Sequence, residues 1–372
     1  MKDNLLSSLY RRHPGYTRFL EETLKKKPGA VRLQGLAGSS ASILASALFA
    51  DSKKPFVAIL TEKDDAAYFY GDLVSLTGEN DVLFFPSSYK RSARYTQTDP
   101  ANIVLRTAVL NHLSSGSGRK FIVTYPEGIM EKVISRRTLR KNTMKLKRGE
   151  NLSPGFLEEV LQEYGFTRQD FVSEPGQYAV RGSITDIFSF ATDKPFRIDY
   201  FGDTVESIRV FNPDDQLSES IVNEITVIPN IQDVSIEEAK DSLFDFLPEE
   251  TVLWVHSPEY IRDRINEICC AGNESGTSLS RQHELHQLVI SGNRCLEEIS
   301  SFRHFITGNS VSESAHNIFS FNTEPQPAFN KNFALLGEKM VRNSAEGFIN
   351  CIVSENESQI ERLRDIFAEV NP

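Results

Sequence analysis

The run of short strands between Glu174 and Phe211 constrains the fold of this chain more than any other stretch. Phe196 to Phe201 is an extended run that stops at Gly202-Asp203, a two-residue turn signal of the hairpin type. Side chains alternate in direction along a strand, so one face carries Arg197, Asp199 and Phe201. A core face would bury two charged side chains, which is unfavourable. We therefore expect this face to look outward.

An outward face that carries a large aromatic beside an arginine has two interpretations. Arg and Phe are enriched in the energetically dominant centres of protein–protein interfaces, so the face suits a docking surface. The alternative is an ordinary solvated strand face on which a neighbouring loop covers Phe201. Residue types alone leave both open.

The same stretch resembles a small β-rich module shared by the bacterial transcription-repair coupling factors and the excision-repair helicase subunit UvrB. The shared pattern is E-P-G-x-[FY]-x-x-R-G, then D-[IL]-F, then P-[FY]-R-[IL]-[DE]-[FY]-F-[GD]-[DE]. Its three parts here are Glu174 to Gly182, Asp186 to Phe188 and Pro195 to Asp203. The resemblance implies docking onto the repair protein UvrA through Arg181, Arg197 and Phe201. We expect substitutions of these outward residues to leave folding intact, and Asp199 to hold Arg197 in its binding rotamer.

Length and composition set broader limits. A chain of 372 residues is long enough for about two or three structural units. A net charge of −10 argues against a nucleic-acid binder that uses its whole surface. None of the 4 cysteines stands in a C-x-x-C pair, so reduced thiols are expected rather than a disulfide framework or a zinc site. No run approaches the length of a membrane span, and no membrane partner is expected. These features predict a cytoplasmic protein.

A degenerate phosphate-binding loop is predicted near the N-terminus. A brief strand at Arg32 to Leu36 runs into a glycine loop, and a helix follows at Ile43 to Ala50, which is the layout of such a loop. A working loop needs a lysine for the phosphates and a following hydroxyl for magnesium. No lysine lies between Pro28 and Ser52. We therefore expect a non-functional remnant, without cofactor or catalysis, at Gly35, Gly38, Ser39, Ala41 and Ser42.

Strands and helices alternate over the first part of the chain. Apolar runs of strand length at 56–60, 81–85 and 121–125 are separated by helical patterns at 63–76 and 102–113. This alternation predicts a mostly parallel sheet with helices on both faces. The run 121–125 ends without the acidic pair that would hold a metal in an active NTPase. Further strands are expected at 251–256, 316–321 and 347–353, and helices at 332–342 and 357–370.

The segment from Phe85 to Pro100 distinguishes the two related families. UvrB inserts a long tyrosine-rich hairpin near this point to clamp damaged DNA, whereas only 16 residues are available here. Together with the lost lysine, this favours the coupling factors over the helicase subunit.

Two other features suggest binding sites. Lys132 to Arg148 carries eight basic residues and no acid, which fits contact with DNA phosphates or a solvated helix and strand. No aromatic is interleaved to stack on bases. His283 and His286 have the spacing of a metal pair, but no further ligands are evident, so a polar helix is the preferred interpretation and no metal is expected.

The predicted architecture is α/β. It is a degenerate helicase or RecA-like parallel-sheet domain, split in sequence by an inserted small β-rich (α+β) module. The expected boundaries are 1–150 for the first half, 151–232 for the module and 233–372 for the second half. The resemblance implies a non-catalytic part of transcription-coupled excision repair that docks onto UvrA.

In the coupling factors, RNA polymerase and DNA are bound by other parts of the protein, so the chain is expected to be an N-terminal fragment or a severed module of such a protein. The alternatives are an ATP-dependent helicase subunit of the UvrB type and a direct DNA-binding module.

Overall fold

The computed structural model describes residues 5–89, 98–116, 118–231, 240–274, 288–308, 317–330, 332–352, 354 and 356–370. The chain divides into two compact units, Met1–Thr323 and Glu324–Pro372. The expected boundaries at 150 and 232 stay a prediction.

A seven-stranded sheet is the centre of the first unit. All its neighbouring strands run parallel, in the order β17-β1-β16-β15-β2-β4-β3. Residues 56–59 and 252–255, in two neighbouring inner strands, are continuous apolar runs, as expected for strands covered on both faces. The strands are β1 (Gly29–Gln34), β2 (Phe56–Ile59), β3 (Val82–Phe85), β4 (Phe121–Thr124), β15 (Val252–His256), β16 (Arg303–Thr307) and β17 (Asn317–Ser320).

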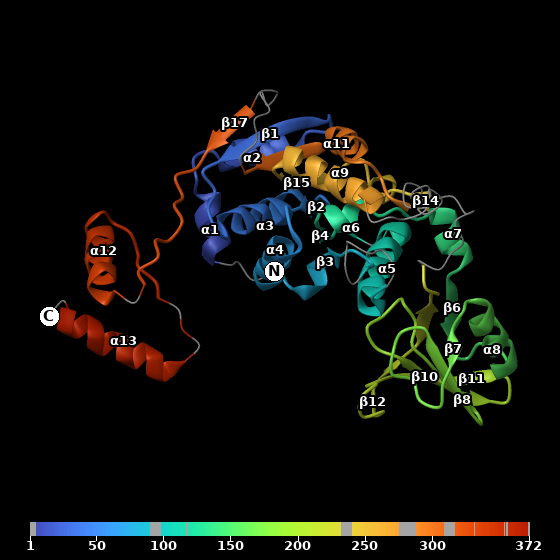
Figure 1. Cartoon of the computed structure of the whole chain (residues 1–372). Coiled ribbons are helices and arrows are strands. Elements are labelled where there is room, and N and C mark those ends of the chain that lie inside the picture. Colours follow the sequence, from blue (N-terminus) through green and yellow to red (C-terminus); the bar gives the residue numbers. More distant parts are fainter. Residues whose placement is uncertain are drawn as a thin grey trace. The chain divides into compact units, whose positions relative to one another are not determined.

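Alternate side chains of β2 enter two separate cores. Phe56 and Ala58 belong to one buried cluster together with side chains of α2, α3 and α4. Val57 and Ile59 belong to the other, together with side chains of α5, α6, α9 and α11. The helices are labelled in Figure 1: α1 (Leu5–Arg11), α2 (Tyr16–Leu24), α3 (Ser40–Ser52), α4 (Lys63–Thr77), α5 (Pro100–Ser115), α6 (Pro126–Met130), α7 (Arg136–Lys141), α9 (Pro258–Glu274) and α11 (Gly292–Ser300).

Short elements complete this part of the chain. Two antiparallel pairs join β5 (Val133–Ile134) to β14 (Lys240–Asp241) and β6 (Met144–Lys147) to β13 (Glu224–Val227). The 3-10 turns are η1 (Glu79–Asp81) and η2 (Leu243–Phe246).

A second sheet forms the β module, in the order β12-β11-β10-β9-β8-β7. One face packs against α8 (Pro154–Glu163), whose cap Ser153 accepts a hydrogen bond from Phe156 N and whose first residue is proline. The strands are β7 (Thr167–Arg168), β8 (Gln177–Arg181), β9 (Ile184–Ile187), β10 (Phe196–Phe201), β11 (Thr204–Phe211) and β12 (Ser218–Val222). The predicted fold class, a parallel α/β sheet with a separate β module between its strands, is confirmed.

The second unit contains α12 (Phe333–Ala345) and α13 (Glu357–Val370), close to the predicted helices. The strand predicted at 347–353 is wrong over its described residues, because 347–352 adopt no regular structure and follow the end of α12. Phe348, Ile349 and Ile352 are exposed there rather than buried in a sheet.

None of the described helices is both long enough and apolar enough to cross a membrane.

Candidate partner-docking site

Two glycine-led hairpin turns place Arg181 and Phe201 at the same end of the module sheet. Each residue is followed by a glycine with φ of +61°, and Arg181 and Phe201 pair with Ile184 and Thr204 across the turns. A glycine at the first central position suits a type II′ turn. Because β8 and β10 both pair antiparallel with β9, they run in the same direction and their last residues meet at one end.

The strand register also places these residues on one face. Arg181 lies opposite Ile184, which lies opposite Asp199 on β10. Directly opposed residues share a face, and so do residues two apart on one strand. Burial along β10 alternates from Phe196 onward, and Phe201 is 80% exposed. The prediction that Phe201 faces outward is confirmed, and none of the loops that the structure describes covers it.

The two arginines of this face converge on one buried carboxylate, Asp186. Arg197 donates from Nε and Nη2 to Asp186 at 2.8 and 2.9 Å, and Arg181 donates from Nη2 to the same group. Asp186 has 0% exposure, so the two guanidinium groups compensate its charge. The hydrogen bond to Asp186 is the largest cause of a raised pKa of Arg197.

Arg197 is far less exposed than the sequence indicated. Only 16% of its side chain is accessible, its guanidinium lies 4.5 Å from the centre of the Phe211 ring, and Nη1 donates to Gln216 O. The expectation that Asp199 holds Arg197 is wrong, because Asp199 accepts hydrogen bonds from Ser207 Oγ and Arg209 Nη2, both at 2.6 Å. Asp186 performs that role instead.

A loop before β8 explains why this face is partly closed. Residues 169–176 cross it and bury Val172 in a small cluster with Ala179, Phe188 and Phe211. The next residue back, Phe171, is 64% exposed, and the Arg181 guanidinium lies 5.1 Å from its ring centre. Sequence reasoning did not select Phe171 or Asp186. Asp186 is the first residue of the D-[IL]-F motif, and this motif could have indicated its importance. Nothing in the sequence pattern pointed to Phe171.

The remnant glycine loop lies between β1 and α3, with Gly35 and Gly38 both at positive φ. A Cβ on Gly35 would lie 1.9 Å from Phe321 O, so only glycine fits there. Backbone N–H groups of such loops normally hold phosphate oxygens. Here Ala37 N donates to Thr323 Oγ1 at 2.7 Å, and Thr323 Oγ1 donates to Gly35 O at 2.6 Å. Part of the loop is therefore already bound by the chain itself.

A cleft of about 410 Å³ lies beside this loop, at the carboxyl ends of the parallel strands. Ser39, Ala41 and Ser42 line it, and Ser42 Oγ donates to Asp72 Oδ2 at 2.6 Å. The described lining includes Asp65 and Asp72 but no lysine or arginine. An acidic lining without a cation is unfavourable for a phosphate chain.

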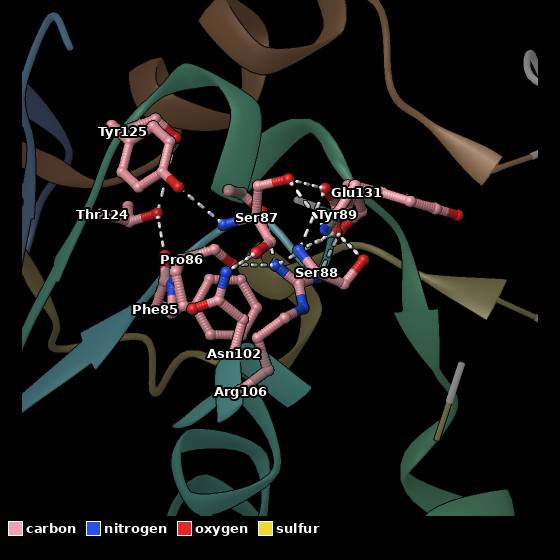
Figure 2. Close-up of polar contacts among 11 residues, drawn as sticks. Phe85, Pro86, Ser87, Ser88, Tyr89, Asn102, Arg106, Thr124, Tyr125 and Glu131 are labelled. Carbon is pink, nitrogen blue, oxygen red and sulfur yellow. Dashed lines mark hydrogen bonds and ion pairs between the residues drawn. The ribbon is translucent and has the colours of Figure 1, made fainter. Parts of the chain in front are cut away.

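The connection that follows β3 is fixed by a buried polar network. Figure 2 shows Ser87, Ser88 and Arg106 converging on Glu131, which is 3% exposed. Glu131 accepts hydrogen bonds from Ser87 Oγ at 2.5 Å and from Ser88 Oγ at 2.6 Å, and Arg106 Nη1 lies 3.5 Å from its carboxylate. Ser87 N donates to Tyr125 Oη at 3.0 Å. The first residues of this connection are therefore held in place.

Both ends of the connection come together. Tyr89 forms a β-bridge with Thr98, and Asp99 N donates to Ser88 O at 2.8 Å. Residues 90–97 lie outside the described part of the chain.

Several of the basic residues between Lys132 and Arg148 have partners within the protein. Arg136 Nη2 donates to Phe246 O at 2.6 Å, and Arg148 Nε donates to Glu206 O at 2.9 Å. Lys145 and Lys147 pair with Glu224 across the β6–β13 ladder. These contacts favour a structural role, and DNA contact stays a prediction. His283 and His286 lie outside the described residues.

Comparisons with known proteins find matches for the module that carries this site. Residues 144–232 match the family model of the UvrB interaction domain. The chain is similar to the transcription-repair-coupling factor of Bacillus subtilis (strain 168), with 33% identity over 211 residues, 56% of this chain and 17% of that protein. It is 24% identical to the Escherichia coli (strain K12) transcription-repair-coupling factor over 247 residues, 66% of this chain and 21% of that protein.

The chain is also similar to a protein other than the coupling factors, the UvrABC system protein B of Erwinia tasmaniensis. The two are 25% identical over 252 residues, which are 62% of this chain and 37% of that protein. The matches thus span about a fifth of the coupling factors' length. They confirm the resemblance predicted from the sequence: residues 144–232 match the UvrB interaction domain, and the chain is similar to part of the transcription-repair-coupling factors.

Proposed function

We propose that this chain is a non-catalytic module of transcription-coupled nucleotide excision repair that docks onto UvrA. Through that contact it recruits the excision machinery to stalled transcription complexes. RNA polymerase and DNA are bound by other parts of a longer protein of the coupling-factor type.

One observation supports docking above the others. Within a domain that matches the UvrB interaction domain, Phe201 is 80% exposed at the rim of a sheet whose turns and ion pairs are fixed. An exposed aromatic on a rigid support loses little conformational freedom on binding, which favours its use as an anchor. Arg181, beside it on the same face, supplies a planar donor for a carboxylate.

The proposal of a non-catalytic role has its own support. The glycine loop has no lysine, Thr323 binds part of its backbone, and the adjacent cleft has an acidic lining. Each feature weakens phosphate binding, so neither ATP nor magnesium is proposed as a ligand.

A pull-down of the full chain on immobilised, purified UvrA tests the function. We expect the chain to be retained and purified UvrB to displace it, because both would use a UvrB interaction domain. Retention that excess UvrB leaves unchanged would place the chain elsewhere on UvrA. Absence of retention would refute the proposal.

A further inference from the structure

The two arginines of the docking face differ in what they offer a partner. Arg197 donates from Nε, Nη1 and Nη2 to Asp186 and Gln216, and its side chain is 16% exposed. Arg181 donates to Asp186 and to Asp170 O, and its side chain is 36% exposed. A guanidinium whose three nitrogens are already bound within the protein is poorly placed to take a further carboxylate. Arg181 is the better placed of the two.

Phe171 supports Arg181 and is itself accessible. Its ring lies 5.1 Å from the Arg181 guanidinium carbon, within the range of a cation–π contact. The neighbouring Val172 is fully buried against Ala179, Phe188 and Phe211, which fixes the backbone beside Phe171. With 64% of Phe171 exposed, the chain presents an aromatic and a stacked cation side by side.

We propose that Phe171 and Arg181 act as one contact unit that receives a carboxylate flanked by apolar surface on UvrA. Arg197 is a positioning residue that acts through Asp186. This inference rests on the proposed function and adds Phe171 as a second aromatic anchor, in addition to Phe201.

The physical reason is preorganisation. Stacking on an aromatic ring restricts the arginine side chain before binding, so less freedom is lost when a partner arrives. Arg197 donates two hydrogen bonds to the buried Asp186 and thereby holds in place the carboxylate that orients Arg181. Loss of Phe171 should therefore weaken binding without unfolding the module, whereas loss of Arg197 should weaken folding first.

Affinity for purified UvrA and thermal unfolding are measured on the full chain and its variants. Phe171→Ala should bind at least about tenfold more weakly, and Phe171→Tyr, which keeps the ring, within about threefold of the unchanged chain. The matched control is Phe156→Ala, since Phe156 is also exposed (51%) but lies in the first turn of α8, on the opposite side of the sheet. Its affinity should stay unchanged, and all three variants should melt as the unchanged chain does.

A double-mutant cycle separates a contact unit from two independent contacts. In an Arg181→Ala background, Phe171→Ala should cause a clearly smaller loss than it does alone. Arg197→Lys should lower the melting temperature, whereas Phe171→Ala should not.

Three results would overturn the inference while the proposed function stands: Phe171→Ala binding as tightly as the unchanged chain, losses that multiply independently in the cycle, or Arg197→Lys weakening binding with unchanged melting. Failure of the unchanged chain to bind UvrA would instead refute the proposed function, and the inference with it.

Discussion

Arg197 and Asp186 form a bidentate ion pair across neighbouring strands, with Arg197 Nε and Nη2 at 2.8 and 2.9 Å from the two carboxylate oxygens. Asp186 is fully buried, and Arg197 and Arg181 are the two cations paired with it. The pair is part of the module's fold, although the sequence pattern placed Arg197 on a solvated face.

Removal of Arg197 should therefore destabilise the protein. Arg197→Ala leaves Asp186 with one cation instead of two, and we expect a loss of roughly 3 kcal/mol in the free energy of unfolding. The matched control is Arg168→Ala, because Arg168 pairs with Glu158 at 2.8 Å while 58% exposed, and exposed pairs contribute about 1 kcal/mol or less. Urea denaturation of both variants gives the comparison; equal stabilities would show that the buried pair is not structural.

The network on Glu131 should be equally sensitive. The Glu131 carboxylate accepts hydrogen bonds from Ser87 and Ser88 and faces Arg106. In Glu131→Gln, the amide NH₂ group replaces one of the accepting oxygens and points its N–H donors at these donor groups. We expect a loss of about 2 to 4 kcal/mol in the free energy of unfolding. Glu159→Gln, at an exposed position of α8, is the control and should be neutral. A neutral Glu131→Gln in denaturant unfolding would contradict the description of the network.

Phosphate release from ATP should stay at background, with or without DNA. The physical reasons are the missing lysine and the acidic cleft beside Ser42. Ser42→Ala serves as the check on contamination: turnover that the unchanged chain shows and this variant loses would belong to the protein, and would favour the helicase alternative.

Stability should fall as the pH drops below about 6.5, in part because of His304. Burial is the largest cause of a lowered pKa of this imidazole. The unfolded chain then binds more protons than the folded one between the lowered pKa and the ordinary value near 6.5, so unfolding is favoured in that window. Above it both states are neutral at this site. His304→Gln should reduce the slope of unfolding free energy against pH between 7.5 and 5.5; an unchanged slope would exclude a contribution from this residue.

Side-chain periodicity predicted the position and orientation of strands that have one buried face, or that are apolar on both faces. It predicted the runs at 56–60 and 121–125 as strands and the outward direction of Phe201, all of which the structure has. Those patterns are local, and a strand's own residues determine them.

The failures come from contacts between segments distant in sequence. Arg197 is covered because its guanidinium lies over the Phe211 ring and donates to Gln216 O, contacts that alternation within β10 does not reveal. The sequence pattern did not predict the inner strand β16, because Arg303 and His304 make this segment polar. Both are almost fully buried there, with Arg303 3.6 Å from Glu22. A buried strand that contains charged residues with distant partners lacks the apolar pattern by which buried strands are predicted.

The affinity of Phe201→Ala for purified UvrA tests the central claim most directly. Phe201 is the most exposed aromatic of the described module and lies on the face that is proposed to dock, so its truncation should weaken binding at least about tenfold with an unchanged melting temperature. Phe156→Ala, measured alongside, should bind as the unchanged chain does. If Phe201→Ala folds normally and also binds UvrA as the unchanged chain does, the docking site lies on another surface.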